Sequence, residues 1–555
     1  MTRHIARYVI ASIVLLIAST VLCGAQSTPQ FTVTMQPVTM PGLPSLQSFA
    51  WAQSGGKWLL LGGRTNGLHL FVRSSNHGAT APPNAFPTTS ANTNAWVIDP
   101  VNHRVYSEPL RSAGLSPTIV AHLSANNAQR VQNGDTLYIM GGYGADGSGN
   151  MITFPYLTAI QVSKAIKAII YHRPLTAYVQ QTNTFVDCPQ AGSNAFNSCH
   201  PQPPTCSPGP DYQQCIEQQQ NSCLQQQQQA ITQCSSQVQS GSVKGLPTNT
   251  GYYARVTGGG MAQVGKYYYL VMGQDFEGLY STAQGDYGKW PVNQVYTQRI
   301  TAFWLTPPPN LSAAVLKVLQ QDPNDQSAPY NRRDLNVVPE LSPSGAENIG
   351  VYGGVFVPGQ ETAYRQPILI ENGDNLAQVS ATVQTYQQMM SQYECAQLPM
   401  ADQANGNMIQ VFFGGISLYK LDYKTMKFRM DEALPFIRNI STVMHGSNGW
   451  SEFVRKEPLP ALMGTDATFI PNPAVAVAPN GVVLLNKVQG RTLVGWVFGG
   501  ILASAPLTEG TTPPTRASNA LYQVWVTPGA PPEDYWIPAV VPKRTAGTPP
   551  PNPKP

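Results

Sequence analysis

Short apolar segments that end in a pair of glycines recur along the chain. The segment at residues 491–500 shows the pattern most clearly, because its apolar residues run directly into Gly499 and Gly500. Five further segments share it, at residues 57–63, 135–142, 267–274, 349–354 and 408–415. A short apolar run bounded by turn residues is typical of a buried strand. Because the pattern returns along nearly the whole length, the chain is predicted to be a repeat protein.

Each repeat is predicted to contain four strands. Ahead of the first glycine pair, residues 31–36 alternate between apolar and polar positions, and residues 49–53 and 57–61 follow as further strands. Residues 94–106 then form two short strands joined by a tight turn at an Asp-Pro pair. The equivalent third strands of the other units are predicted at residues 156–162, 299–305, 365–370, 418–421 and 519–525.

A glycine pair followed by a hairpin of the form Asn-x-aromatic-x-x-Asp-Pro resembles the kelch repeat. The segment that resembles it most combines the pair Gly62-Gly63 with Trp96, Asp99 and Tyr106. Kelch repeats form the blades of β-propellers. The resemblance therefore implies an all-β fold, a six-bladed kelch-type β-propeller built from four-stranded antiparallel blades.

The glycine pairs have a physical role in such a ring. A four-stranded blade cannot bury both of its faces alone, so blades pack side by side and close into a circle. Glycine allows a positive φ, or a close approach of the neighbouring backbone, where a Cβ would clash. In the third unit Gln274 replaces one glycine. The last unit ends near Trp525, so we expect residues 31–36 to complete the sixth blade and to latch the ring.

The first 25 residues have the features of a secretory signal peptide. Arg3 and Arg7 precede an apolar run at residues 8–22, which is too short for a comfortable membrane span, and Ala25 is a suitable cleavage site. We therefore expect a secreted or periplasmic protein with no membrane span in its mature chain. Cys23 leaves a lipoprotein as the alternative.

Composition agrees with a repeat of short strands and argues against a nucleic-acid partner. Charged residues make up 11% of the chain, while glycine and proline number 48 and 49, as short strands with many turns require. The formal net charge is +4. This is far from the basic surface of a nucleic-acid-binding protein.

Residues 174–250 form a predicted helical, disulfide-rich insertion between propeller segments 26–173 and 251–541, and residues 542–555 are a proline-rich tail. Six cysteines lie within it: Cys188, Cys199, Cys206, Cys215, Cys223 and Cys234. In an exported chain they indicate a local disulfide framework, with 15 possible pairings, that leaves Cys395 unpaired. Residues 211–234 suit a helix with its three cysteines on one face, opposite a Pro-rich strip. A disordered Gln-rich linker and a zinc site are the alternatives.

Two shorter segments are also predicted to be helical. Residues 311–319 follow a capping Asn, and residues 376–393 repeat apolar side chains at steps of three and four after a sequence that resembles a capping box. Residues 444–450 are predicted as a rim loop and residues 474–477 as an inner strand.

The residues just after each glycine pair are the ones that a propeller presents at its mouth. The candidate binding residues at this rim are Arg64, Asn66, His69, Tyr143, Asp146, Asp275, Glu277, Glu361 and Arg365. Asp275 and Glu277 lie two residues apart, so they could act as a carboxylate pair or hold a cation. Solvated charges on a rim are the simpler interpretation.

No metal or cofactor site is predicted. Kelch-type propellers include copper oxidases and sugar-acid isomerases, but none of the histidines stands in a short motif with a second metal ligand; those that follow the signal peptide are His69, His77, His103, His122, His172, His200 and His445. The sequence also lacks a nucleophile elbow, a phosphate loop and a zinc motif.

The leading expectation is a non-catalytic binding or scaffold module that holds a protein or glycan partner on the loop-decorated rim. A carbohydrate-active propeller enzyme, of the sugar isomerase, hydrolase or oxidase type, is the alternative, and a structural subunit of a surface assembly is the third. A deep axial pocket where polar side chains of several blades converge with displaced pKa values would favour the enzyme. A flat apolar mouth would favour a partner surface.

Overall fold

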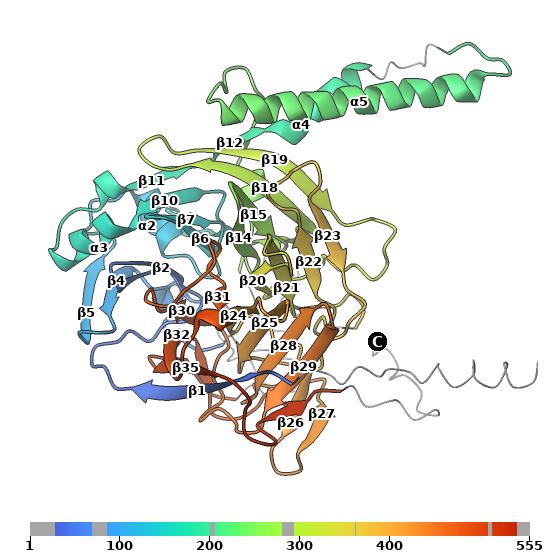
Figure 1. Ribbon diagram of the computed structural model, residues 1–555. Coiled ribbons are helices and arrows are strands. Elements are labelled where there is room, and N and C mark those ends of the chain that lie inside the picture. Colours follow the sequence, from blue (N-terminus) through green and yellow to red (C-terminus); the bar gives the residue numbers. More distant parts are fainter. Residues whose placement is uncertain are drawn as a thin grey trace, which may run out of the picture.

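The protein is a six-bladed β-propeller with a helical insertion held by three disulfides (Figure 1). The computed structural model describes residues 28–68, 86–199, 206–279, 293–360, 362–508 and 513–540. This confirms the predicted fold class. The predicted signal peptide, Cys23 and the tail from residue 542 lie outside the described residues.

Each blade is built from four antiparallel strands. The first three blades contain β2 (Ala50–Ser54), β3 (Lys57–Leu61), β4 (Asn94–Asp99) and β5 (Arg104–Pro109); β6 (Gln129–Asn133), β7 (Thr136–Met140), β10 (Leu157–Gln161) and β11 (Val179–Thr182); and β14 (Gly260–Val264), β15 (Tyr267–Val271), β18 (Arg299–Thr306) and β19 (Ser312–Gln320). The last three contain β20 (Asn336–Leu341), β21 (Glu347–Tyr352), β22 (Ile368–Glu371) and β23 (Ser380–Val383); β24 (Ala396–Asp402), β25 (Asn407–Phe413), β28 (Ile440–Gly446) and β29 (Gly449–Arg455); and β30 (Ala467–Pro471), β32 (Thr492–Gly499), β35 (Leu521–Pro528) and β1 (Phe31–Val38).

The N-terminal strand closes the ring, as predicted. All eight residues of β1 pair with β35, from Phe31 opposite Pro528 to Val38 opposite Leu521. The chain after β35 then crosses to the fifth blade, where β36 (Trp536–Pro538) pairs with β29. Trp536 donates from Nε1 to the carbonyl of Phe31 at 2.9 Å. Both ends of the described chain are therefore attached to the same side of the ring.

The glycine pairs hold neighbouring blades together. The second glycine of a pair donates its N–H to a carbonyl just ahead of the next blade: Gly63 to Ala125, Gly142 to Val256, Gly273 to Arg332, Gly415 to Met463 and Gly500 to Leu46, at 2.8–3.0 Å. Both members of each pair have a positive φ. In the third blade the pair is Met272-Gly273 rather than Gly273-Gln274, so the predicted position there was wrong by one residue. The glycines thus mark the points where one blade is bonded to the next.

Aromatic side chains fill the space between blade faces. Trp58 of the first blade meets Trp496 of the sixth edge to face at 5.4 Å between ring centroids. Tyr138 and Tyr268 make the same contact between the second and third blades at 5.3 Å. Buried apolar area between the sheets is the main source of stability in such a ring.

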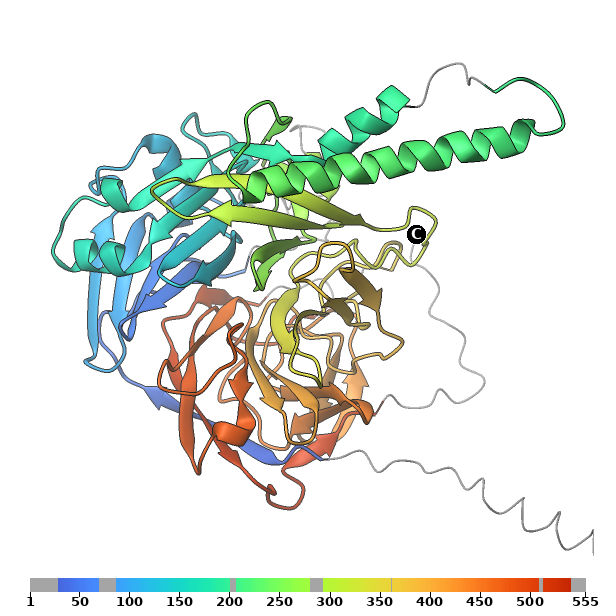
Figure 2. The same cartoon turned by 45° about the horizontal axis from the view of Figure 1, so that its top comes forward.

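The insertion forms a helical hairpin on the outside of the third blade. It begins at β12 (Thr184–Asp187), which runs parallel to β19, and returns at β13 (Thr248–Thr250). Between them, helices α4 (Cys188–Cys199) and α5 (Tyr212–Gln239) pack against each other. Figures 1 and 2 both show α5 extending well beyond the propeller body. The hairpin thus stands outside the ring.

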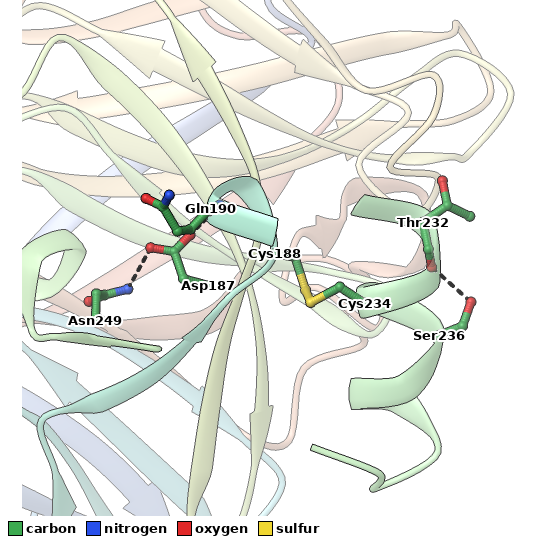
Figure 3. Close-up of a disulfide and its surroundings, with 7 residues drawn as sticks. All are labelled: Asp187, Cys188, Gln190, Thr232, Cys234, Ser236 and Asn249. Carbon is green, nitrogen blue, oxygen red and sulfur yellow. Dashed lines mark hydrogen bonds between the residues drawn. A yellow bond between two sulfur atoms is a disulfide. The ribbon is translucent and has the colours of Figure 1, made fainter. Parts of the chain in front are cut away.

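Three disulfides join the two arms of the hairpin as nested rungs. Their pairs are Cys188–Cys234, Cys199–Cys223 and Cys206–Cys215. Cysteines eleven residues apart lie on one helix face, so equal spacing in α4 and α5 brings two pairs into register. At the base, the carboxylate of Asp187 accepts hydrogen bonds from Gln190 N–H at 3.0 Å and Asn249 Nδ2 at 3.2 Å (Figure 3). Disulfides form in oxidising compartments, in agreement with the predicted export.

The two outer disulfides, Cys199–Cys223 and Cys206–Cys215, are expected to be reduced in the folded protein before the base disulfide, Cys188–Cys234. Cys188 and Cys234 are both buried, and Cys395 is only 2% exposed, whereas each outer disulfide has one half-buried cysteine, Cys199 or Cys215, that a reductant can reach. Brief reduction and alkylation of the folded protein should therefore label the four cysteines of the outer two rungs and leave these three unlabelled. Peptide mass spectrometry measures the pattern, and the same reaction in urea is the control, where all seven should react. Labelling of Cys395 in the folded state would contradict its burial.

Several local predictions were wrong. The predicted helix at 311–319 is strand β19, because pairing with β18 outweighs an apolar spacing that suits both structures. The segment 376–393 contains β23 and irregular chain, since the fourth blade needs an outer strand. Residues 418–421 belong to the small hairpin of β26 (Tyr419–Asp422) and β27 (Lys427–Met430), not to the third strand. The predicted rim loop at 444–450 is part of β28 and β29, and residues 474–477 follow the inner strand β30.

None of the described helices has the length and apolar character that crossing a membrane requires.

Candidate functional site

One residue of every blade lies near the propeller axis in a left-handed backbone conformation. These residues and their φ angles are Ser48 (54°), Asn127 (50°), Gly258 (64°), Asp334 (54°), Glu394 (40°) and Asp466 (53°). Backbone hydrogen bonds link them from blade to blade; the N–H of Asp466, for example, donates to the carbonyl of Glu394 at 2.6 Å. Non-glycine residues in this conformation cost free energy and cluster at functional sites.

All of these residues except Gly258 line a pocket on the axis. All six blades contribute to its wall, and the cavity volume is about 110 Å³. The residue after each glycine pair also lines it, including Arg64, Tyr143 and Gln274. A water molecule occupies roughly 30 Å³ of liquid, so the pocket accepts the end of a ligand or a small substituent.

Three carboxyl groups from successive blades meet in this pocket. Glu394 is hydrogen-bonded to both Asp334 and Asp466, and Ser48 is hydrogen-bonded to Asp466. Burial within the ring raises the pKa of all three carboxyls, and their mutual repulsion raises that of Glu394 well above its usual range. The pKa of Asp466 is raised to about 7. Carboxyls this close cannot all ionise, so they share protons at neutral pH.

Two arginines balance this charge in different ways. Arg333 lies beside Asp334, with 3.4 Å between Nε and Oδ2, and donates from Nη1 to Gln274 Oε1 at 2.9 Å. Arg64 approaches from the first blade and is 4% exposed. Its Nε donates to Asn66 Oδ1 at 2.9 Å, while its Nη2 has no hydrogen-bond partner among the described residues. Burial lowers the pKa of Arg64 to about 10, so the side chain stays charged at neutral pH.

A buried guanidinium with an unused donor indicates a missing acceptor. Leaving a buried polar group without a partner costs about 1–3 kcal/mol, more when it is charged. The hydroxyl of Thr465, just ahead of the sixth blade, is also buried and unpartnered within the described chain. Both residues line the axial pocket.

The structure separates the predicted rim residues into two groups. Arg64 and Tyr143 line the axial pocket, and Asn66 positions Arg64. Asp146 instead accepts hydrogen bonds from Ser148 and Asn150 within its own loop. His69 and Glu361 lie outside the described residues.

The remaining predicted residues lie elsewhere on the body. Glu277 makes a 2.5 Å ion pair with Arg255, and the pKa of Asp275 beside them is raised by burial to about 6. The guanidinium of Arg365 covers Tyr419 at 5.0 Å and donates to the carbonyl of Gln388 at 2.7 Å. The carboxylate pair Asp275–Glu277 therefore belongs to an ion-pair group of the third blade rather than to the axial pocket.

The sequence prediction missed the carboxyl cluster. Asp334, Glu394 and Asp466 each stand one or two residues ahead of an inner strand, a position that no motif marked. The only sequence signal was a polar residue just ahead of the inner strand in most repeats.

Metal ligation finds no support in the described part of the chain. No group of three or more His, Cys, Asp or Glu residues there is arranged to hold a metal ion. His122, which is buried, contacts Thr158 Oγ1 and the carbonyl of Gly141 at 2.7 and 2.9 Å. His445 pairs with Glu340 at 2.9 Å between blades.

Comparisons with known proteins add nothing on the activity of this chain. No protein-family model and no curated protein sequence matches the chain. Among the solved structures that match, one titled "Structure of YjhT" is similar over 88% of this chain and 99% of its own, with 8% sequence identity and a TM-score of 0.40. The strand pairing described above establishes the fold, and the axial pocket is the site with the most distinctive chemistry in the described chain.

Proposed function

We propose that this protein is an extracytoplasmic propeller enzyme that catalyses proton transfer on a small, hydroxylated, carbohydrate-like ligand. One observation carries the proposal: three proton-sharing carboxyls and a buried guanidinium with a free N–H face a single axial pocket. Polar side chains of several blades with displaced pKa values are the arrangement that distinguishes an enzyme from a flat docking surface.

The chemistry follows from the charges. Arg64 supplies a fixed positive charge for an anionic group or a strongly polarised oxygen of the ligand. A protonated carboxyl of the cluster can donate a proton to a ligand oxygen, while an ionised neighbour accepts one, so acid and base stand in one pocket near neutral pH. Asp334, Glu394 and Asp466 are the groups proposed to hold these protons. No metal is needed for such transfers.

Substitution of Arg64 tests the ligand site. Thermal shift with a panel of monosaccharides, sugar acids and hydroxy acids identifies a ligand, and isothermal titration measures its affinity. Arg64→Met should weaken binding about 10- to 100-fold, because a charge-assisted hydrogen bond in a buried site is lost. Arg491→Met is the matched control, since Arg491 covers Trp525 at 4.0 Å on the outer part of the sixth blade. A panel without any hit, or equal affinity in both variants, overturns the proposal.

Catalysis is tested with the ligand so found. Glu394→Gln keeps the size of the side chain and removes its exchangeable acid. Turnover followed by NMR should fall by about 100-fold or more while binding persists. Binding without turnover in the wild-type protein would leave a ligand-binding propeller and refute the enzyme.

The second candidate is the binding or scaffold module for a protein or glycan partner. It is favoured by the loops that follow the glycine pairs, which carry small hairpins on four blades around the pocket: β8 (Tyr143–Ala145) with β9 (Met151–Thr153), β16 (Gln274–Glu277) with β17 (Asn293–Tyr296), β26 with β27, and β33 (Ile501–Ala503) with β34 (Thr515–Ala517). Such a partner would bind Arg64→Met and Glu394→Gln variants as well as the wild type, and this separates the two functions.

We also propose that the repeat is of the kelch type. Support comes from the glycine pairs and from the hairpin of β4 and β5, which holds Trp96, Asp99 and Tyr106. Asp99 closes its turn by accepting hydrogen bonds from the backbone N–H and the Nδ2 of Asn102.

A further inference from the structure

The outward face of α5 carries an uncharged polar seam. Six exposed side chains form it at alternating steps of four and three residues: Gln214, Gln218, Asn221, Gln225, Gln228 and Thr232. The cysteines and Ile231 lie on the opposite side, toward α4. Nearly half of the helix is glutamine, and Glu217 is its only charged residue. An exposed helix face without charges is unusual, because such faces normally carry Lys, Arg and Glu.

The hairpin is built as a rigid projection. With 28 residues, α5 is about 42 Å long. Its C-terminal part packs on β19, while its N-terminal end extends away from the blades (Figure 2). The Cys199–Cys223 and Cys206–Cys215 bridges fix α5 to the other arm of the hairpin where no blade supports it. Ordering this segment in advance lowers the entropic cost of binding a partner.

We propose that the seam binds the seam of a second copy of this chain, with the two α5 helices antiparallel. A carboxamide both donates and accepts hydrogen bonds, so a glutamine face is complementary to itself. The steps of four and three keep the seam facing a partner helix along its whole length. A two-fold contact uses the same surface on both molecules, and an antiparallel one keeps the two propellers at opposite ends.

The chemistry of the face favours this partner over others. Charged partners such as nucleic acid or an acidic peptide find no complementary charge on it, and an apolar partner finds no apolar stripe. Each α5 helix carries one charged side chain, Glu217. Two copies therefore repel each other little. One helix face is smaller than the roughly 800 Å² per partner of a standard interface, so we expect a weak dimer that forms only at high protein concentration.

Sedimentation velocity of the full chain between about 1 and 200 µM tests the seam. The wild type should shift from monomer to dimer over this range. Gln218→Glu, Gln225→Glu and Thr232→Glu together should keep the protein monomeric. The matched control places the same three charges on a different exposed face of α5, as Ser222→Glu, Gln226→Glu and Gln233→Glu, and should dimerise like the wild type.

Complementary charges provide a second readout. A variant with Gln218→Lys, Gln225→Lys and Thr232→Lys should form a heterodimer with the seam Glu variant although neither dimerises alone, and folding of each variant is checked by circular dichroism. A wild type that stays monomeric throughout overturns the proposal. Equal loss of dimer in the control, or no heterodimer on mixing, also overturns it, because the seam would then not be the contact. The axial pocket is not involved in either outcome.

Discussion

Replacing Gly414 by alanine is expected to destabilise the propeller by roughly 4 kcal/mol or more, or to prevent its folding. Gly414 has a φ of 65°, a conformation that costs alanine about 1–2 kcal/mol. A Cβ at this position would in addition overlap the carbonyl oxygen of Met463, which leads into the sixth blade. That oxygen already accepts the N–H of Gly415 at 3.0 Å, so it cannot move without breaking the contact between blades.

Gly490 offers a matched control for this prediction. Its φ is 55°, but no atom lies within 4 Å of the place that a Cβ would take. Gly490→Ala should therefore lose only the conformational part, about 1–2 kcal/mol. Urea unfolding followed by tryptophan fluorescence compares the two. Equal losses would mean that backbone conformation alone, rather than the approach of the next blade, requires glycine at the pairs.

The blades could be predicted because a single backbone requirement repeats in each of them. Every glycine pair must turn with positive φ and touch the next blade, and few residues other than glycine do both. Met272 shows the limit of this rule. Its φ is 52°, and the pair Met272-Gly273 makes the same contact with Arg332, so the sequence pattern pointed one residue too far along.

Strand order was less predictable where hairpins are inserted. The hairpin of β26 and β27 follows the fifth glycine pair directly and alternates like an outer strand, while the true third strand β28 comes about 20 residues later. Local pattern describes which residues suit a strand, but the partner strand is decided by packing across the whole blade.

The carboxyl cluster was hidden for a related reason. In the first three blades the axial residue lies 14 positions ahead of the first member of the pair, as for Ser48 and Gly62. In the last three blades the offsets are 19, 20 and 33, because the hairpin between the inner strands is longer or an insertion follows. Asp334, Glu394 and Asp466 thus had no common register in the sequence. Arg64 was predictable because it directly follows its glycine pair.

The axial carboxyls are expected to make the protein less stable as the pH rises. Burial raises the pKa of Asp466 to about 7, while an exposed aspartate in the unfolded chain ionises near 4. Between these values the folded state binds more protons than the unfolded state, so the free energy of unfolding falls with increasing pH. Above about pH 7 the loss is complete. Asp466→Asn removes this group and should raise the free energy of unfolding at pH 8 by an amount on the order of 2 kcal/mol, with a smaller gain at pH 5.

Asp99 supplies a control of opposite sign. Burial opposes its ionisation, but hydrogen bonds from Asn102 and the ammonium of Lys57 outweigh this and hold its pKa below the usual value. Its contribution is present above the unfolded pKa and is lost as the pH falls through the folded one, so Asp99→Asn should destabilise at pH 7 and converge with the wild type in acid. Urea unfolding at several pH values compares the three proteins. A pH-independent effect of Asp466→Asn would refute proton sharing in the pocket.

A gain of stability on removing a buried acid has a direct meaning for function. Three carboxyls held together in left-handed conformations each carry a cost in folding free energy. Folded proteins retain such groups where activity requires them. The same Asp466→Asn variant that unfolds at higher urea concentration at pH 8 should therefore lose the stabilisation that the wild type gains from its ligand. If the variant kept that ligand-induced stabilisation in full, Asp466 would have no part in the proposed site.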